Sequence, residues 1–174
     1  AGGLSDAQYN ENHQQSFRSR NWFGAPYNVA SFTLSYDITN AINLQIKSFA
    51  SFAERNSVGF TNSIITKDSI NPITSEYNNR QVDRDKYKNY GTEARMSVKY
   101  KFFGKENIFA GGLRAYHGGT IRNQKGVGTN GSDFDLSLTN PSYGRSLEFS
   151  TTNLAIFSEN IFQLGKRLKI VPGL

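Results

Sequence analysis

Apolar residues recur at every second position in several stretches of the chain. In the stretch from 41 to 55, the even positions carry most of the apolar residues: Ile42, Leu44, Ile46, Ala50 and Phe52. The odd positions carry mainly polar residues, among them Asn43, Gln45, Lys47 and Arg55. Because side chains alternate between the two faces of a strand, this period of two predicts a β-strand with one apolar and one polar face.

Six segments with this alternation are predicted as strands: residues 22–38, 41–55, 93–102, 108–124, 151–164 and 168–174. In the third of them, Met96 and Val98 occupy one parity, and Arg95 and Lys99 occupy the other. The sequence therefore predicts an all-β, antiparallel fold with about six strands.

The connections between these strands differ greatly in length. Residues 39–41, 104–107 and 165–167 are predicted as tight turns, whereas residues 61–92 and 123–149 are predicted as long polar loops. Loops longer than about 15 residues are uncommon in compact soluble domains. Outer-membrane barrels, in contrast, combine short periplasmic turns with long extracellular loops. The pattern thus predicts a segment of a transmembrane β-barrel, with apolar side chains facing lipid and charged side chains facing a watery lumen.

Two other architectures share this alternation. A soluble β-sandwich would bury the apolar faces in a core, but it would place many basic residues on the solvated face of one sheet: Lys47, Arg55, Arg95, Lys99, Lys101, Arg114 and Arg122. A passive porin would have the same strands without a plug domain. The unequal connections and the charged parity favour a barrel over the sandwich.

The composition narrows the classes of protein further. Hydrophobic residues make up 37% of the 174 residues and aromatic residues 13%, which is typical of half-buried strands with polar loops. No run approaches the roughly 18 consecutive apolar residues of a transmembrane helix. Cysteine is absent, so disulfide frameworks and thiol catalysis are excluded. The net charge of +6 is spread along the chain, which disfavours a nucleic-acid interface and suits an anionic small ligand.

Several strings resemble the TonB-dependent outer-membrane receptors, particularly the branch that resembles the ferric-citrate receptor. They are AGGLSDAQYNENHQQSFRSRNWF at 1–23, ERNSVGF at 54–60, NNRQVDRDKYKNYGTEAR at 78–95, GLRAYHGGTIRNQKGVGTNGSDFDL at 112–136, NLAIFSENIF at 153–162 and LKIVPGL at 168–174. The resemblance covers nearly the whole chain and lies in the barrel of that family.

The resemblance implies a barrel of about 22 strands in the bacterial outer membrane, with a plug domain in its lumen. It also implies active uptake of a ferric siderophore, powered by a TonB-type energising complex that contacts a segment before the barrel. No secretion signal opens the chain, and LKIVPGL reads as the start of a strand. We therefore expect residues 1–174 to be part of the barrel domain, with the plug and the remaining strands elsewhere, and other subunits could lie beside it.

No arrangement of residues predicts catalysis, a cofactor or a metal site. His13 and His117 are far apart in the chain and no triad order accompanies them. Glycines at 126, 128 and 131 match G-x-G-x-x-G, but no helical pattern follows, so a flexible loop is expected instead of a nucleotide site. Asp133 and Asp135 lack the calcium-loop spacing.

Arginines are the predicted ligand-binding residues, because their forked donors match the carboxylate oxygens of an anionic ferric siderophore. The candidates lie near predicted strand ends, in a long loop or on the lumen parity: Arg18, Arg20, Arg55, Arg80, Arg84, Arg114 and Arg122. The alternative is that they pair with acidic residues of the wall, for which Glu54, Glu93 and Glu159 are available. Haem, cobalamin or glycan import would use the same barrel, and the two long loops are expected to close over the ligand.

Overall fold

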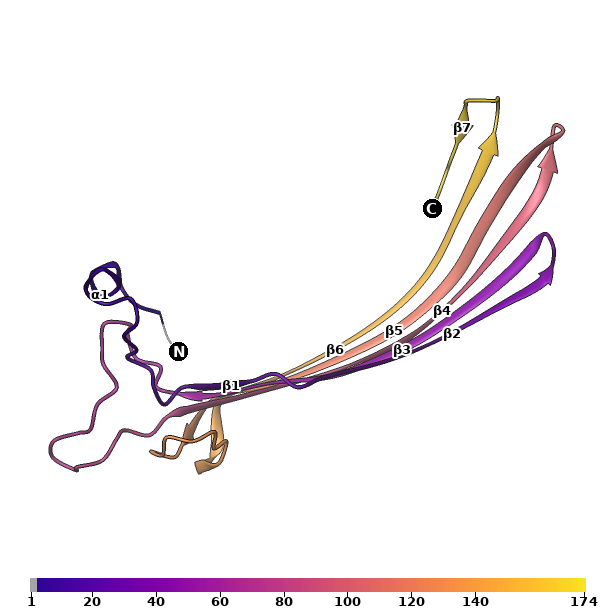
Figure 1. Cartoon of the computed structure of the whole chain (residues 1–174). Coiled ribbons are helices and arrows are strands. Elements are labelled where there is room, and N and C mark those ends of the chain that lie inside the picture. Colours follow the sequence, from indigo (N-terminus) through magenta and orange to yellow (C-terminus); the bar gives the residue numbers. More distant parts are fainter. Residues whose placement is uncertain (1–2) are drawn as a thin grey trace. The chain divides into compact units, whose positions relative to one another are not determined.

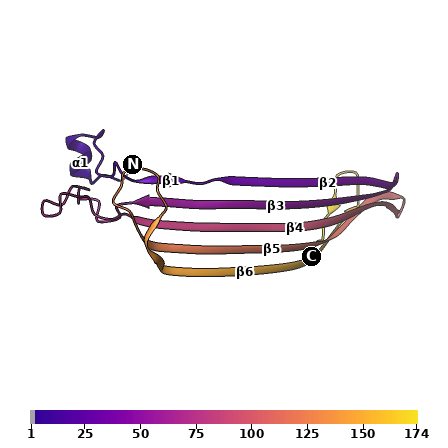
Figure 2. The ribbon, with the colours of Figure 1, turned by 90° about the horizontal axis from the view of Figure 1, so that it is seen from below.

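The computed structural model describes residues 3–174, which form an all-β, antiparallel sheet with one short helix (Figure 1). The elements are α1 (Asp6–Glu11), β1 (Trp22–Gly24), β2 (Tyr27–Thr39), β3 (Ile42–Gly59), β4 (Gln81–Phe102), β5 (Lys105–Gly128), β6 (Leu138–Gln163) and β7 (Lys169–Ile170). The strand order is β1-β3-β4-β5-β6-β7, and β2 also pairs with β3 (Figure 2). The predicted fold class is confirmed to this extent, and the sheet does not close on itself among these residues.

The chain packs as two compact units. Unit 1 comprises the chain up to Tyr27 together with Ala53–Tyr87 and Thr120–Phe149. Unit 2 comprises Asn28–Phe52, Lys88–Gly119 and Ser150–Leu174. In residues 3–174 no helix is long and apolar enough to cross a membrane.

Unit 2 contains the three predicted tight turns, although the second lies at 103–104 and not at 104–107, because β5 already begins at Lys105. β2 ends at Thr39 and β3 begins at Ile42, while β6 and β7 are joined by residues 164–168. Between β4 and β5, Phe103 and Gly104 have φ angles of 47° and 70°. Two successive residues with positive φ are typical of a type I′ turn, whose twist matches that of the strands it joins.

Unit 1 contains the long connections, and here the predicted bounds were wrong. The loops were expected at 61–92 and 123–149, but β4 begins at Gln81, β5 ends at Gly128 and β6 begins at Leu138. The strand ends in this unit carry polar residues on both parities, as in QVDRDKY. A reading based on apolar alternation cannot detect such strands, although backbone pairing continues through them. The connections that remain are 60–80 and 129–137.

Two predicted strands are shorter than expected, and proline explains both differences. The first is broken at Ala25–Pro26 into β1 and β2, although the Glu54 amide still donates to the Pro26 carbonyl at 2.9 Å. At the other end of the chain, the Asn160 amide donates to the Pro172 carbonyl at 2.9 Å. Proline has no N–H to donate in return, so regular pairing there is reduced to the isolated bridge between Glu159 and Gly173.

Cross-strand contacts in unit 2 identify which residues share a face. On one face Ser48 bonds Thr92 at 3.0 Å, the Tyr90 ring lies 5.2 Å from the His117 ring, and His117 bonds Thr152 at 3.1 Å. This face also carries the apolar parity of every long strand, including these residues: Phe32, Leu34, Leu44, Ile46, Met96, Val98, Leu113, Leu154 and Ile156. The opposite face carries Asn43, Gln45, Asn89, Glu93 and Arg95. The division into one apolar face and one polar face agrees with the alternation in the sequence.

The apolar face of unit 2 is not covered by any other segment of that unit. Phe32 is 66% exposed, Leu113 59%, and Leu154 and Ile156 are each 77% exposed. Among residues 3–174, the buried apolar side chains are Val58, Phe60 and Val82, all of which belong to unit 1. Unit 2 therefore has no hydrophobic core of its own, in contrast to a complete soluble sandwich, in which a second sheet covers the apolar face of the first.

Two glycines on the polar face of unit 2 lie under aromatic rings. A Cβ at Gly91 would meet the Ala115 carbonyl at 2.8 Å and the Phe49 ring at 2.9 Å. A Cβ at Gly112 would meet the Ala94 carbonyl and the Phe157 ring, both at 2.5 Å. The absence of a side chain at these positions lets the rings lie flat against the neighbouring backbone, which supports the register of the strands.

We expect Gly112→Ala to lower the free energy of unfolding by about 1–3 kcal/mol, because the added methyl meets backbone as well as a ring. Gly119→Ala is the matched control on the same strand, since its nearest neighbour would be the Lys88 carbonyl at 3.9 Å. Urea unfolding of the intact protein in detergent measures both. Equal midpoints for the two variants would contradict the packing described here.

Candidate functional site

Three of the candidate arginines, Arg18, Arg20 and Arg80, lie in unit 1 and are buried, with exposed fractions of 5%, 3% and 1%. We call them the loop arginine cluster. Arg18 and Arg20 follow α1 and precede β1, and Arg80 immediately precedes β4. Full burial of three cations is costly unless their donors are satisfied, so their partners decide their role.

Arg20 joins several parts of unit 1 through one guanidinium group. Its Nε and Nη2 donate to the two carboxylate oxygens of Asp68 at 2.8 and 2.7 Å. Its Nη1 and Nη2 also donate to the carbonyls of Asn130 at 2.8 Å and Asn78 at 3.3 Å. The group lies 4.1 Å from the centre of the Tyr77 ring. Arg20 therefore connects the 60–80 loop with the 129–137 loop.

Arg80 extends the same connection. Its Nη1 donates to the carbonyls of Asp133 at 2.6 Å and of Arg20 at 3.2 Å, and its Nη2 lies 3.6 Å from the Asp133 carboxylate. Burial lowers the pKa of Arg80 from its ordinary value, and the nearby positive charge of Arg20 lowers it further. The carboxylate of Asp133 acts in the opposite direction.

Arg18 closes the base of the 60–80 loop. Its Nη1 donates to the Thr66 carbonyl at 2.7 Å, and its Nη2 donates to the carbonyls of Asn62 at 2.9 Å and Ser63 at 2.6 Å. Its guanidinium carbon lies 4.9 Å from the centre of the Phe60 ring. The loop arginine cluster thus uses its donors on the carbonyls and carboxylates of its own loops.

The 129–137 loop is further stabilised by Asp135. The backbone N–H of Ser137 is the main cause of the lowered pKa of Asp135, followed by hydrogen bonds from the side chains of Ser137 and Thr129. A lowered folded-state pKa means that the ionised carboxylate stabilises the loop above the ordinary pKa of aspartate. This contribution is lost as the pH falls through the lowered value.

A second group of charges in unit 1 differs from the loop arginine cluster because it is partly open. The Asp85 carboxylate accepts from Nε of Arg122 at 3.2 Å and from the Tyr87 hydroxyl at 3.4 Å, and Nη1 of Arg55 lies 3.7 Å away. The side chain of Asp85 is 2% exposed, whereas those of Arg122 and Arg55 are 33% and 54% exposed. We call these four residues the Asp85 cluster.

The Asp85 cluster carries one more positive than negative charge. A guanidinium group has five N–H donors, and within residues 3–174 the side chain of Arg122 has a hydrogen bond only from its Nε. Arg55 makes an ion pair to Asp85 but its distance of 3.7 Å is too long for a hydrogen bond. Two forked, half-exposed cations held around one buried carboxylate form an arrangement that can bind a further anion.

The remaining two candidates lie apart from both groups. Arg84 is on β4 at the opposite parity from Asp85, and its buried Nε has no hydrogen-bond partner in the part of the chain described. In unit 2, the guanidinium carbon of Arg114 lies 6.0 Å from the centre of the Tyr116 ring. Of the seven predicted arginines, three therefore stabilise loops, two pair with Asp85, and the remaining two, Arg84 and Arg114, belong to neither group.

The acidic partners in these sites differ from those expected from the sequence, which were Glu54, Glu93 and Glu159. Of these, Glu93 pairs with Arg95 at 3.0 Å. Asp68 instead holds the buried pair with Arg20, and Asp85 organises the partly open cluster with Arg122 and Arg55. Asp83, Asp85 and Tyr87 occupy alternate positions on one face of β4. This alternation was the sequence signal that could have revealed Asp85, but the stretch was predicted to be a loop.

No group of three or more His, Cys, Asp or Glu side chains that could hold a metal ion occurs in residues 3–174. No protein-family model and no curated protein matches the chain.

Proposed function

We propose that this chain forms part of the wall of an outer-membrane β-barrel that imports an anionic ferric siderophore, as the TonB-dependent receptors it resembles do. The observation that carries the proposal is the uncovered apolar face of unit 2, opposite a polar face on the same strands. A face with exposed Leu113, Leu154 and Ile156 requires an apolar environment, which a bilayer supplies.

The height of the apolar face in unit 2 suits a bilayer. Aromatic side chains mark both of its ends, with Tyr90 beside His117 at one end and Phe102 beside Phe162 at the other. The twelve residue steps from Tyr90 to Phe102 span about 40 Å along a strand, or about 30 Å across the membrane at a tilt of about 40°. Aromatic side chains at such a spacing are typical of the two membrane–water interfaces.

The proposal requires that the sheet closes. Within residues 3–174, β2 and most of β6 have one side without a strand partner, and unpaired backbone groups are not tolerated in lipid. Further strands must therefore pair with these two edges, as in a barrel of about 22 strands around a plug. A TonB-type complex would then supply energy through the plug.

The Asp85 cluster supports an anionic cargo. It has the parity of Arg95 along β4, which is the polar parity, and it carries an excess positive charge. A siderophore of the citrate type saturates Fe(III) with its own oxygens and presents carboxylates outward, so the receptor needs arginines and no metal ligands. The loop arginine cluster ties 60–80 to 129–137, so these two loops would close over the ligand as one body.

Substitutions in the Asp85 cluster should change the affinity for an anionic ferric chelate in opposite directions. We expect the double substitution Arg55→Gln and Arg122→Gln to weaken binding by about a hundredfold to ten-thousandfold, since each of the two charged hydrogen bonds lost contributes about 1.5–3 kcal/mol. Asp85→Asn removes the competing negative charge and should strengthen binding. Binding of ferric citrate to the purified protein and iron-limited growth measure the two effects.

Arg95→Gln is the control, because this arginine has the same parity but already pairs with Glu93. An uncharged cargo such as cobalamin should bind equally to all variants. Unchanged ferric citrate binding in both the double variant and Asp85→Asn would remove the Asp85 cluster from the ligand site. Binding of haem or a glycan, with no response to ferric citrate, would assign a different cargo to the same barrel.

A further inference from the structure

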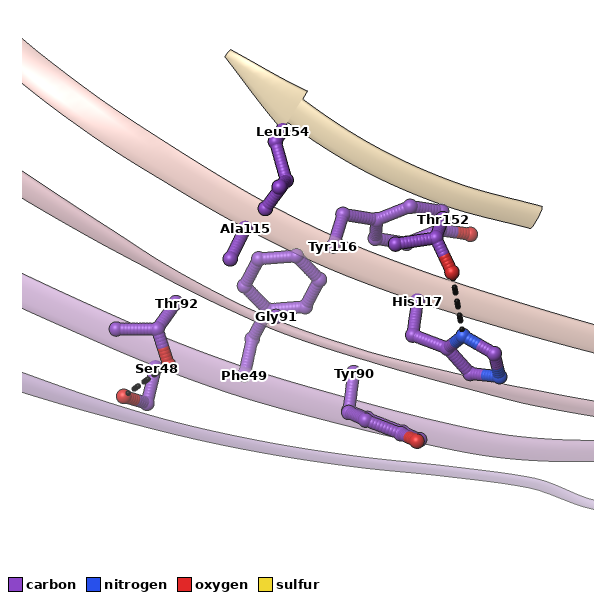
Figure 3. Close-up of a pocket in the computed structure, with 10 residues that line it drawn as sticks. All are labelled: Ser48, Phe49, Tyr90, Gly91, Thr92, Ala115, Tyr116, His117, Thr152 and Leu154. Atoms are coloured by element: carbon purple, nitrogen blue, oxygen red, sulfur yellow. Dashed lines mark hydrogen bonds between the residues drawn. The ribbon is translucent and has the colours of Figure 1, made fainter. Parts of the chain in front are cut away.

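The apolar face of unit 2 contains two adjoining recesses, which together we call the amphipathic groove. The first has a volume of about 430 Å³, and its polar residues include Tyr90, His117 and Thr152 at one end and Ser48 beside Thr92 at the other (Figure 3). The second, of about 530 Å³, is lined mainly by apolar side chains such as Leu113 and Ile156. Thr92, Ala115 and Leu154 line both recesses, so the two are continuous.

Small side chains create the groove. Thr92 and Ala94 on β4 and Ala115 on β5 are small residues of its lining, beside the larger Leu113 and Leu154. These strands are interior to the sheet, so their backbone groups are paired and cannot accept an added strand. A ligand in the groove can therefore contact only its side chains, not unpaired backbone groups.

One end of the groove is polar, and a basic residue, Lys88, lies just beyond that end on the same face. Nδ1 of His117 and the Thr152 hydroxyl share a hydrogen bond of 3.1 Å, and the Tyr90 ring lies against the imidazole at 5.2 Å. Lys88 is exposed, two residues before Tyr90 on the same face, and a Cβ at Gly119 would lie only 3.9 Å from its carbonyl. Since glycine has no side chain there, nothing from that position covers Lys88.

We propose that the amphipathic groove binds a phosphorylated membrane lipid, with its acyl chain in the Leu113–Ile156 recess and its phosphate at Lys88, Tyr90 and His117. A basic residue beside one end and a mainly apolar lining at the other suit an amphiphile with an anionic head. Lys88 supplies the charge, and the hydroxyls of Tyr90 and Thr152 supply hydrogen bonds at the level where lipid phosphates lie. This inference rests on the proposed function, since it places the apolar face in a bilayer.

The test uses the intact protein, purified in detergent and exchanged with lipids of identical acyl chains. Native mass spectrometry should show retained phosphatidylglycerol, which is anionic, in preference to phosphatidylcholine, which has no net charge. We expect Lys88→Glu to reduce the retained phosphatidylglycerol by about tenfold, the loss of roughly 1.4 kcal/mol. Ala115→Phe, which fills the centre of the groove, should reduce retention of both the anionic lipid and any neutral one.

Lys99→Glu is the matched control, because Lys99 lies on the same strand at the opposite parity. Equal retention of phosphatidylglycerol in Lys88→Glu and Lys99→Glu would overturn the proposal, as would equal retention of the two lipids by the native protein. Displacement of the lipid by inorganic phosphate at millimolar concentration would overturn the requirement for an acyl chain. Failure of the native protein to enter liposomes at all would instead contradict the membrane barrel itself, so the two failures can be distinguished.

Discussion

Replacing Arg20 with alanine is expected to release the two long loops of unit 1. The substitution leaves the 2% exposed Asp68 side chain without its partner and removes the donor to Asn130 in the other loop. Removing one member of a buried ion pair costs about 3–5 kcal/mol. Hydrogen exchange of the segments 60–80 and 129–137 should therefore become faster by about two to four orders of magnitude.

A similar substitution at an exposed ion pair is the control. Arg95 pairs with Glu93 at 3.0 Å, but its side chain is 53% exposed, so Arg95→Ala should cost less than about 1 kcal/mol. Arg20→Lys keeps the positive charge but loses the paired N–H donors of the guanidinium group, so we expect exchange rates between those of the native protein and Arg20→Ala. Exchange rates in the two loops that do not change in Arg20→Ala would show that Arg20 does not hold them.

The loop arginine cluster shows why residue type alone does not distinguish an arginine that is available to a ligand from one whose donors are used within the fold. From the sequence, arginines near strand ends and in a long loop have donors available for an anionic ligand. The structure places Arg18, Arg20 and Arg80 among the carbonyls of loops that are distant in the chain, for example Arg20 beside Asn130. Such long-range contacts leave no periodic signal in the sequence, so their role became visible only in the folded chain.

The alternation of side chains was sufficient for those features that depend on one strand and its neighbours. It predicted the tight turns. It also predicted that Met96 and Val98 share the apolar face, and that Arg122 lies on the polar face. It failed where both parities are polar, from Gln81 to Asn89, because a paired strand with two polar faces resembles a loop in composition. That failure also concealed Asp85, the residue that brings Arg55 and Arg122 together.

The two groups of arginines imply a division of labour within unit 1. The loop arginine cluster is buried and its donors are bound, so it fixes the relative positions of 60–80 and 129–137. The Asp85 cluster keeps two guanidinium groups partly exposed around a buried carboxylate. For the proposed uptake of an anionic chelate, this arrangement would place the affinity in the Asp85 cluster, whose pairing can change, while the loops beside it stay fixed.

The orientation of the apolar face leads to the second large effect. Met96 lies midway between Tyr90 and Phe102 on β4 and is 40% exposed on the apolar face of unit 2. If this face meets acyl chains, Met96→Arg places a charge near the middle of the bilayer, which costs about 2–4 kcal/mol in membrane barrels. We expect less folded protein in the outer membrane and a lower urea midpoint in liposomes, in proportion to that cost.

Ser97→Arg places the same charge one residue further along β4, on the polar face. It should cost less than about 1 kcal/mol, because a wet lumen solvates the guanidinium group and screens Arg95 and Lys99. The two variants share the strand, the introduced side chain and nearly the same depth in the bilayer. Any difference between them therefore reports which face of the sheet meets lipid. A soluble sandwich would respond to Met96→Arg by unfolding in water without detergent, whereas equal tolerance of both variants in a bilayer would show that neither face meets lipid.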